Sequence, residues 1–154
     1  MSEGDQRASV VAEVKTWIGT PYHSHGRSKG AGVDCAMLLA EVYHAVGLID
    51  RVEPGFYPPD WHLHRGTERY IEQVIRIARE LHGEEEKRPG DILLVKFGRT
   101  FSHGAVIVDW PMCIHAMMES KTGYVDALRD GVFRAPGGSF RPFRFFSLWH
   151  RGAV

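Results

Sequence analysis

Hydrophobic and polar positions follow a helical period in the first half of the chain. Apolar residues recur three or four positions apart in three stretches, residues 6–18, 34–46 and 67–81. Gly19 and Gly47 stand directly after the first two stretches, where a glycine commonly ends a helix. We therefore predict three amphipathic helices, with a long irregular connection before the third.

The second half of the chain has a different pattern. Short runs rich in β-branched and aromatic residues are separated by Gly, Pro and Asp, and they cover residues 91–97, 104–110, 112–118 and 140–149. Helices followed by strands predict an α+β fold in which N-terminal helices pack on an antiparallel sheet. The chain shows no internal repeat and no sign of a second domain, so we predict a single domain over residues 1–154.

Composition and charge narrow the function classes. Nineteen basic and nineteen acidic residues cancel, and 44% of the residues are hydrophobic. This balance predicts a globular protein with no electrostatic footprint for nucleic acid or an anionic membrane. No apolar run reaches the length of a membrane span. The N-terminal sequence MSEGDQRASV is polar and predicts no signal peptide, so we expect a cytoplasmic protein or export by another route.

Cys35 is the first candidate for chemistry. It opens the most apolar predicted helix, in the sequence GVDCAMLLAEVYHAVG. The free backbone N–H groups and the dipole at a helix start favour a thiolate, which nucleophilic catalysis requires. A small buried residue that happens to begin a helix is the alternative interpretation, and position alone leaves both open.

Two histidines on neighbouring predicted strands are candidates for the rest of a reaction centre. His103 lies where a loop enters an apolar run, and His115 lies among apolar residues of the next run. His103 would act as base and His115 would hold its tautomer. A hairpin with a three-residue turn would offset them by four residues, about 13 Å, so we expect a twist or bulge to close the gap. On that register Glu119 stands opposite His103 and is the second candidate for the orienting group.

The remaining motifs give only weak evidence for a phosphate-binding or metal-binding site. The glycines of residues 23–33 lack the Gly-Lys-Ser/Thr that follows in a phosphate-binding loop. The pairs His23-x-His25 and His62-x-His64 have no accompanying Cys or acidic cluster at zinc spacing, so we expect neither a metal nor another cofactor. Cys113 is expected to be a buried strand residue with no part in the reaction.

The ordered set of motifs resembles the NlpC-type cell-wall peptidases, which are cysteine hydrolases of papain-like fold. The resemblance covers most of residues 11–118, in the order WIGTPYHSHG, GVDCAMLLAEVYHAVGL, RPGDILLV, SHGAVIV and IHAM. It implies Cys35 as nucleophile, His103 as base and His115 as orienting residue. It further implies that Tyr22 and Asp34 lie beside the active site, where they would help to bind substrate and the oxyanion.

The resemblance also implies a substrate and a setting. The expected reaction is cleavage of an amide in the peptidoglycan stem peptide, between D-glutamate and the diamino acid. The insert YPPDWHLHRGTERYIEQV resembles the branch of tailed phages and prophages, which implies tail-tip partners and delivery by a phage-like particle. Two alternatives stay open, namely an amidase or acyltransferase on the same fold, and a catalytically silent tail-assembly module.

Overall fold

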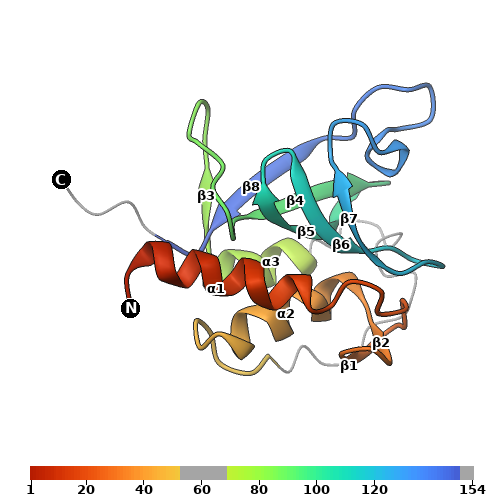
Figure 1. The fold of residues 1–154 in the computed structure, drawn as a ribbon. Helices are drawn as coiled ribbons and strands as arrows, with labels where there is room; N and C mark the ends of the chain where they lie inside the picture. Colours follow the sequence, from red (N-terminus) through yellow and green to blue (C-terminus); the bar gives the residue numbers. More distant parts are fainter. Residues whose placement is uncertain (53–68, 150–154) are drawn as a thin grey trace.

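Three helices lie together on one side of a curved antiparallel sheet (Figure 1). The computed structural model describes residues 1–52 and 69–149. The helices are α1 (Glu3–Lys15), α2 (Cys35–Ala45) and α3 (Arg69–Ile77). The predicted α+β class with helices packed on an antiparallel sheet is confirmed.

The sheet has six strands in the order β3-β8-β4-β5-β6-β7, and every neighbouring pair is antiparallel. Its strands are β3 (Arg79–Leu81), β4 (Ile92–Phe97), β5 (Thr100–Asp109), β6 (Met112–Ala116), β7 (Thr122–Asp126) and β8 (Phe143–Ser147). A separate two-stranded sheet, β1 (Arg27–Ser28) with β2 (Gly32–Val33), stands just before α2.

Alternation along the strands divides the core between the two faces of the sheet. Ile92, Leu94 and Val106 face the helices and join the core formed with α1 and α2. The opposite face is covered by the segment that follows β7 and includes the 3-10 turn Gly131–Phe133. Its buried side chains are Leu93, Val95, Ala105, Ile107, Cys113, Ala127 and Phe133. Strands β4 and β5 of the sheet are therefore buried on both faces.

The predicted third helix is wrong in its last turn. The chain leaves α3 after Ile77, and residues 79–81 form the edge strand β3 against β8. Glu80 accepts two hydrogen bonds from the Arg144 guanidinium on β8, which fixes this pairing. Tertiary pairing thus overrides a helical period that continues to Leu81 in the sequence. Residues 53–66 of the irregular connection predicted over residues 48–66, and residues 67–68 of the predicted third helix, lie outside the described residues.

Two further boundaries differ from the prediction. Helix α1 begins earlier, at Glu3, because Ser2 and Asp5 form a capping box. Strand β5 begins at Thr100, so His103 lies inside a strand and not at its entry. Its register with β4 shifts between Val95 and Lys96, where a bulge re-aims the side chains.

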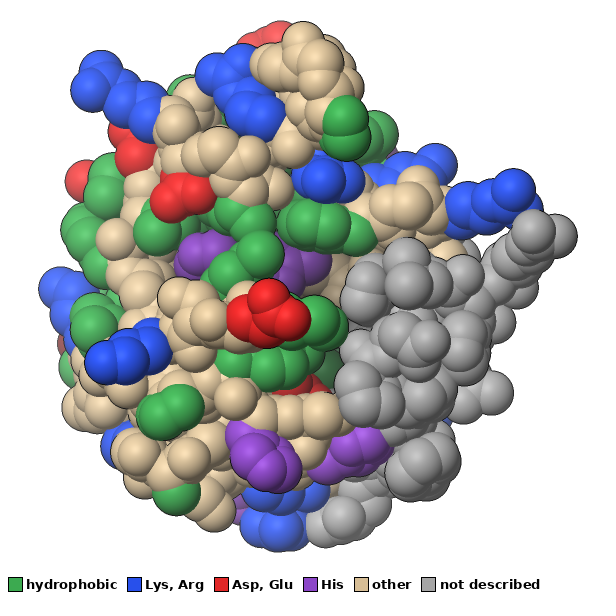
Figure 2. Space-filling model, turned by 90° about the vertical axis from the view of Figure 1, so that its right-hand side faces the viewer, with side chains coloured by type: hydrophobic (Ala, Val, Ile, Leu, Met, Phe, Trp, Pro, Cys, Tyr) green, Lys and Arg blue, Asp and Glu red, His purple; other side chains and the backbone are tan. Residues whose placement is uncertain are grey.

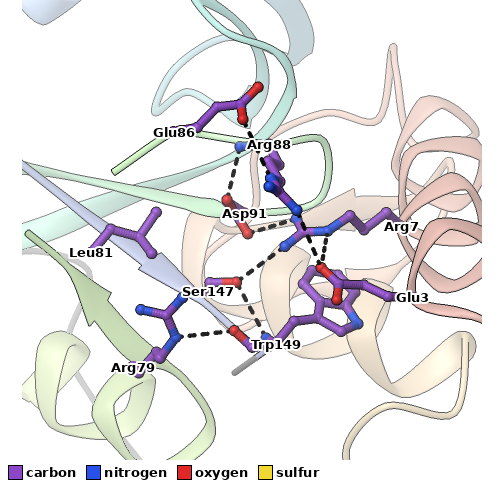
Figure 3. A pocket seen from close by; sticks show the side chains of 9 residues that line it. All are labelled: Glu3, Arg7, Arg79, Leu81, Glu86, Arg88, Asp91, Ser147 and Trp149. Carbon is purple, nitrogen blue, oxygen red and sulfur yellow. Dashed lines mark hydrogen bonds and ion pairs between the residues drawn. The ribbon is translucent and has the colours of Figure 1, made fainter. Parts of the chain in front are cut away.

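A buried ion pair fastens α1 to the sheet (Figure 3). Arg7 donates to Asp91 Oδ1 at 2.8 Å and to the Pro89 carbonyl at 2.8 Å. Asp91 is 1% exposed, and its other oxygen accepts from the backbone N–H of Arg88 at 2.9 Å. The Trp149 ring covers the Arg7 guanidinium at 4.1 Å. Within residues 1–52 and 69–149, no helix has the length and hydropathy needed to cross a membrane.

Candidate active site

Cys35 is the first residue of α2, as the sequence predicts. Asp34 caps this helix, because its carboxylate accepts from the backbone N–H of Met37 at 2.8 Å. The same carboxylate accepts from the backbone N–H of His25 at 2.8 Å, which ties the preceding loop to the helix start. Asp34 is 2% exposed. Its place is that of a helix cap, and a carboxylate cannot itself stabilise an oxyanion.

The sulfur of Cys35 lies against the strand that carries His103. Its Sγ is 3.6 Å from the carbonyl oxygen of Ser102, the residue directly before His103. The backbone N–H of Gly104, the residue directly after His103, hydrogen-bonds the sulfur and favours the thiolate, as do the N–H groups of Ala36 and of Cys35 itself. The helix start and the interior of β5 therefore meet at the thiol.

The expectation of a lowered pKa for Cys35 is wrong, although the N–H groups at the helix start do favour the thiolate. Burial first, and the Asp34 carboxylate after it, raise the pKa of the thiol to about 12 against the opposing effect of the three backbone N–H groups. Cys35 is only 5% exposed. At neutral pH the side chain is a thiol, so a base must remove its proton during the attack.

This raised pKa makes alkylation of Cys35 slow at neutral pH. In a Cys113→Ala variant, which leaves one cysteine, we expect iodoacetamide to react with Cys35 far more slowly than with glutathione at pH 7. The rate should rise about tenfold per pH unit from pH 7 to pH 10, because only the thiolate reacts. Mass spectrometry of the intact protein measures it. A plateau below pH 8 would indicate a preformed thiolate–imidazolium pair instead.

His103 and His115 form a hydrogen-bonded pair. His103 Nε2 and His115 Nδ1 are 2.8 Å apart, and both side chains are buried. Strand pairing sets Val106 opposite Ile114, so the next step sets Ala105 opposite His115. The two histidines are thus offset by two residues, and the predicted offset of four is wrong. A tight turn at residues 110–111 and a bulge after Ile107 change the register.

His115 can accept a hydrogen bond from His103. Burial lowers the pKa of His115 to about 4, against a smaller opposing effect of Asp130, so its ring is neutral at pH 7. A neutral imidazole donates or accepts at Nδ1 according to its tautomer, and in the tautomer in which His115 accepts, His103 is the donor at Nε2. That tautomer leaves the lone pair of His103 on Nδ1, the nitrogen that a base toward Cys35 would use. The Phe133 ring packs on His115 at 5.3 Å.

Glu119 is not placed to orient His103. It is exposed, has a positive φ of 62°, and lies in the turn between β6 and β7. The register that set it opposite His103 does not occur. Of the two candidates for the orienting group, the structure brings only His115 to His103.

Tyr22 lies close to the thiol. Burial raises its pKa, and the charges of Cys35 and Asp34 raise it further, which places the hydroxyl in the electrostatic field of both groups. The half-buried ring packs on the core beside them. The neutral hydroxyl is therefore available as a hydrogen-bond donor near Cys35.

The remaining sequence candidates take no visible part. Cys113 is fully buried in β6, as predicted. His23 and His25 bond to Ser24 within their own loop. Over the described part of the chain, no three His, Cys, Asp or Glu side chains group as metal ligands. His62 and His64 lie outside the described residues.

One face of the molecule exposes histidine side chains among hydrophobic ones (Figure 2). The sequence predicts both histidines of the pair as site residues, but it does not predict the aromatic rings that surround them. Phe97 meets His103 edge-on at 5.4 Å, and Phe133 lies 6.4 Å from it. Phe97 ends a predicted strand, yet Phe133 lies in a segment without periodic signal, so only the folded chain reveals that contact.

Comparison with solved structures identifies the fold. The chain is similar to the NlpC/p60 domain of the peptidoglycan hydrolase SagA, with a TM-score of 0.60 and 19% identity over 90% of this chain and 96% of that one. It is also similar to RipB, a peptidoglycan hydrolase of Mycobacterium tuberculosis, with a TM-score of 0.60, 16% identity, and coverage of 98% and 70%. The chain therefore has an NlpC/p60 fold.

A third similar structure, NlpC2 of Trichomonas vaginalis, has a TM-score of 0.62 and 16% identity. The match covers 95% of this chain but 47% of that one, so this chain spans about half of the longer relative. No protein-family model matches the sequence, and no curated protein matches it either.

Proposed function

We propose that this protein is a cysteine peptidase that hydrolyses an amide bond in the stem peptide of peptidoglycan. The observation that carries the proposal is the hydrogen bond between His103 and His115. The residues on either side of His103, Ser102 and Gly104, contact the Cys35 sulfur. The NlpC/p60 fold supports the substrate class, since SagA and RipB are both described as peptidoglycan hydrolases. The bond between D-glutamate and the diamino acid is the proposed site of cleavage.

The proposed reaction begins with proton transfer. His103 Nδ1 takes the thiol proton as the Cys35 sulfur attacks the amide carbonyl, and His115 accepts the hydrogen bond of the resulting imidazolium. His103 then protonates the leaving amine, which breaks the C–N bond and leaves a thioester. Water, deprotonated by His103, attacks the thioester and releases the carboxylate and the thiol.

The oxyanion of the tetrahedral intermediate needs donors at the sulfur. The backbone N–H of Cys35 at the start of α2 is one donor in reach of this position. The Tyr22 hydroxyl is the proposed second donor, because burial and neighbouring charge keep it protonated. Asp34 contributes by holding the helix start and the loop in place.

We further propose that a phage-like particle delivers the enzyme to the cell wall, with tail-tip proteins as partners. The support is the sequence resemblance of the insert at residues 57–74, most of which lies outside the described residues. Co-purification of the chain with tail-tip proteins from the same genome tests this proposal separately from the activity.

The deciding experiment measures soluble peptides released from purified peptidoglycan, identified by mass. We expect wild type to release peptides that begin with the diamino acid, leaving alanyl-D-glutamate on the glycan, and Cys35→Ala to release none, because the nucleophile is missing. Cys113→Ala is the matched control and should retain activity. Equal release by wild type and Cys35→Ala would contradict the thiol mechanism, and new muramic acid–alanine cleavage would indicate an amidase. No release from either would favour the silent module.

A further inference from the structure

Arg141 is joined to the histidine pair through one aromatic ring. Its guanidinium lies 4.1 Å above the centre of the Phe97 ring, and the same ring meets His103 edge-on at 5.4 Å. Two ring contacts thus connect a cation to the proposed base. A planar guanidinium stacks well on an aromatic face and keeps its N–H edges available in the plane.

The backbone holds Arg141 in this position. Its N–H donates to the Phe133 carbonyl at 3.0 Å, and the Phe133 ring packs on His115. The next residue, Pro142, accepts from the N–H of Lys96 at 3.1 Å, beside Phe97. The segment that carries Arg141 is therefore anchored both to the histidine pair and to the end of β4.

Arg141 differs from the other stacked arginines in its hydrogen bonds. Its Nε is buried and has no partner, and within residues 1–52 and 69–149 its guanidinium forms no ion pair with a carboxylate. By contrast, Arg7 binds Asp91, Arg144 binds Glu80, and Arg134 donates to the carbonyls of Gly138 and Leu128. Arg141 as a whole is half-buried, and its one buried N–H lacks an acceptor, which a bound anion at the guanidinium would supply.

The segment that carries Arg141 is basic. Its described residues 131–149 contain three arginines and no acidic residue, although Asp130, directly before it, acts on His115. A carboxylate is the group that a guanidinium binds most specifically, through two parallel N–H···O bonds. Stem peptides carry a free carboxyl on D-glutamate and another on the diamino acid, one on each side of the proposed scissile amide.

We propose that Arg141 binds a carboxylate of the stem peptide next to the bond that is cut, and so selects substrates with a free acid at that place. This inference rests on the proposed function. Arg141 is a binding residue here and takes no part in proton transfer. Amidation of the recognised carboxyl would then protect the peptide from cleavage.

The test compares matched peptides with wild type, Arg141→Met and Arg141→Lys. One peptide has both carboxyls free, one has the D-glutamate α-carboxyl amidated, and one has the diamino acid carboxyl amidated. For Arg141→Met we expect KM for the free acid to rise about tenfold to a hundredfold with little change in kcat, since a charge-assisted bond is lost. Wild type should show the same rise with only one of the amides, which identifies the carboxyl.

The matched control is Arg134→Met, because Arg134 is also stacked on a ring, Phe140 at 3.8 Å, but has carbonyl partners. It should leave KM unchanged. Direct binding of the three peptides to Cys35→Ala, with and without Arg141→Met, gives a readout that needs no turnover. If Arg141→Met weakens acid and amides equally, or not at all, the inference is overturned. A wild type that cleaves none of the peptides would instead refute the proposed function.

Discussion

Replacing His103 by Ala is expected to lower kcat/KM at pH 7 about 10⁴-fold, the upper end of what general acid–base catalysis contributes. The reason lies in the thiol. With its pKa raised to about 12, Cys35 is almost entirely a thiol at pH 7, so without a base almost no nucleophile exists. The residual activity should rise about tenfold per pH unit from pH 7 to pH 10, as hydroxide takes over the deprotonation, whereas wild type should level off.

Peptide release followed at several pH values measures this profile. His82→Ala, which removes an exposed histidine in the turn after β3, is the matched control and should follow wild type. Circular dichroism checks that His103→Ala is folded. A His103→Ala profile parallel to that of wild type would show that another group takes the proton, and the Cys-His-His mechanism would then be wrong.

The parts of the site that sequence could predict are those with local causes. Cys35 follows an N-cap Asp and precedes an apolar period, so its place at a helix start is a local property. The partnership of His103 with His115 depends instead on strand register. One bulge and a tight turn change the offset from four residues to two, and no local pattern predicts a bulge there. The sign of the Cys35 pKa shift does not follow from the local sequence, because burial is a property of the whole fold.

The same distinction holds for the fold. Strands β4, β5, β6 and β8 were predicted because each carries its own run of apolar or aromatic residues. For strand β3 the sequence predicts a helix, because Arg79–Leu81 continue the helical period, and only pairing with β8 makes them extended. Strand β7 has a half-buried polar sequence, TGYVD, and was not predicted.

The largest stability effect is expected at Asp91. Replacing it by Ala should lower the free energy of unfolding by about 3–5 kcal/mol, because the Arg7 guanidinium would stay buried without its counter-ion. Arg7 has 11% of its side chain exposed, and the Arg88 N–H would lose its acceptor as well. Urea unfolding followed by circular dichroism measures the change.

Glu3→Gln is the matched control for this ion pair. Glu3 also binds Arg7, at 2.9 Å, but 44% of its side chain is exposed, so we expect a loss below about 1 kcal/mol. Equal losses in the two variants would contradict a special role for the buried pair.

Because Asp91 precedes β4, and β4 pairs with the strand that carries His103, a distorted site would lower activity in Asp91→Ala beyond its unfolded fraction. Activity proportional to the folded fraction would show that the Arg7–Asp91 ion pair stabilises the fold without affecting the reaction at Cys35.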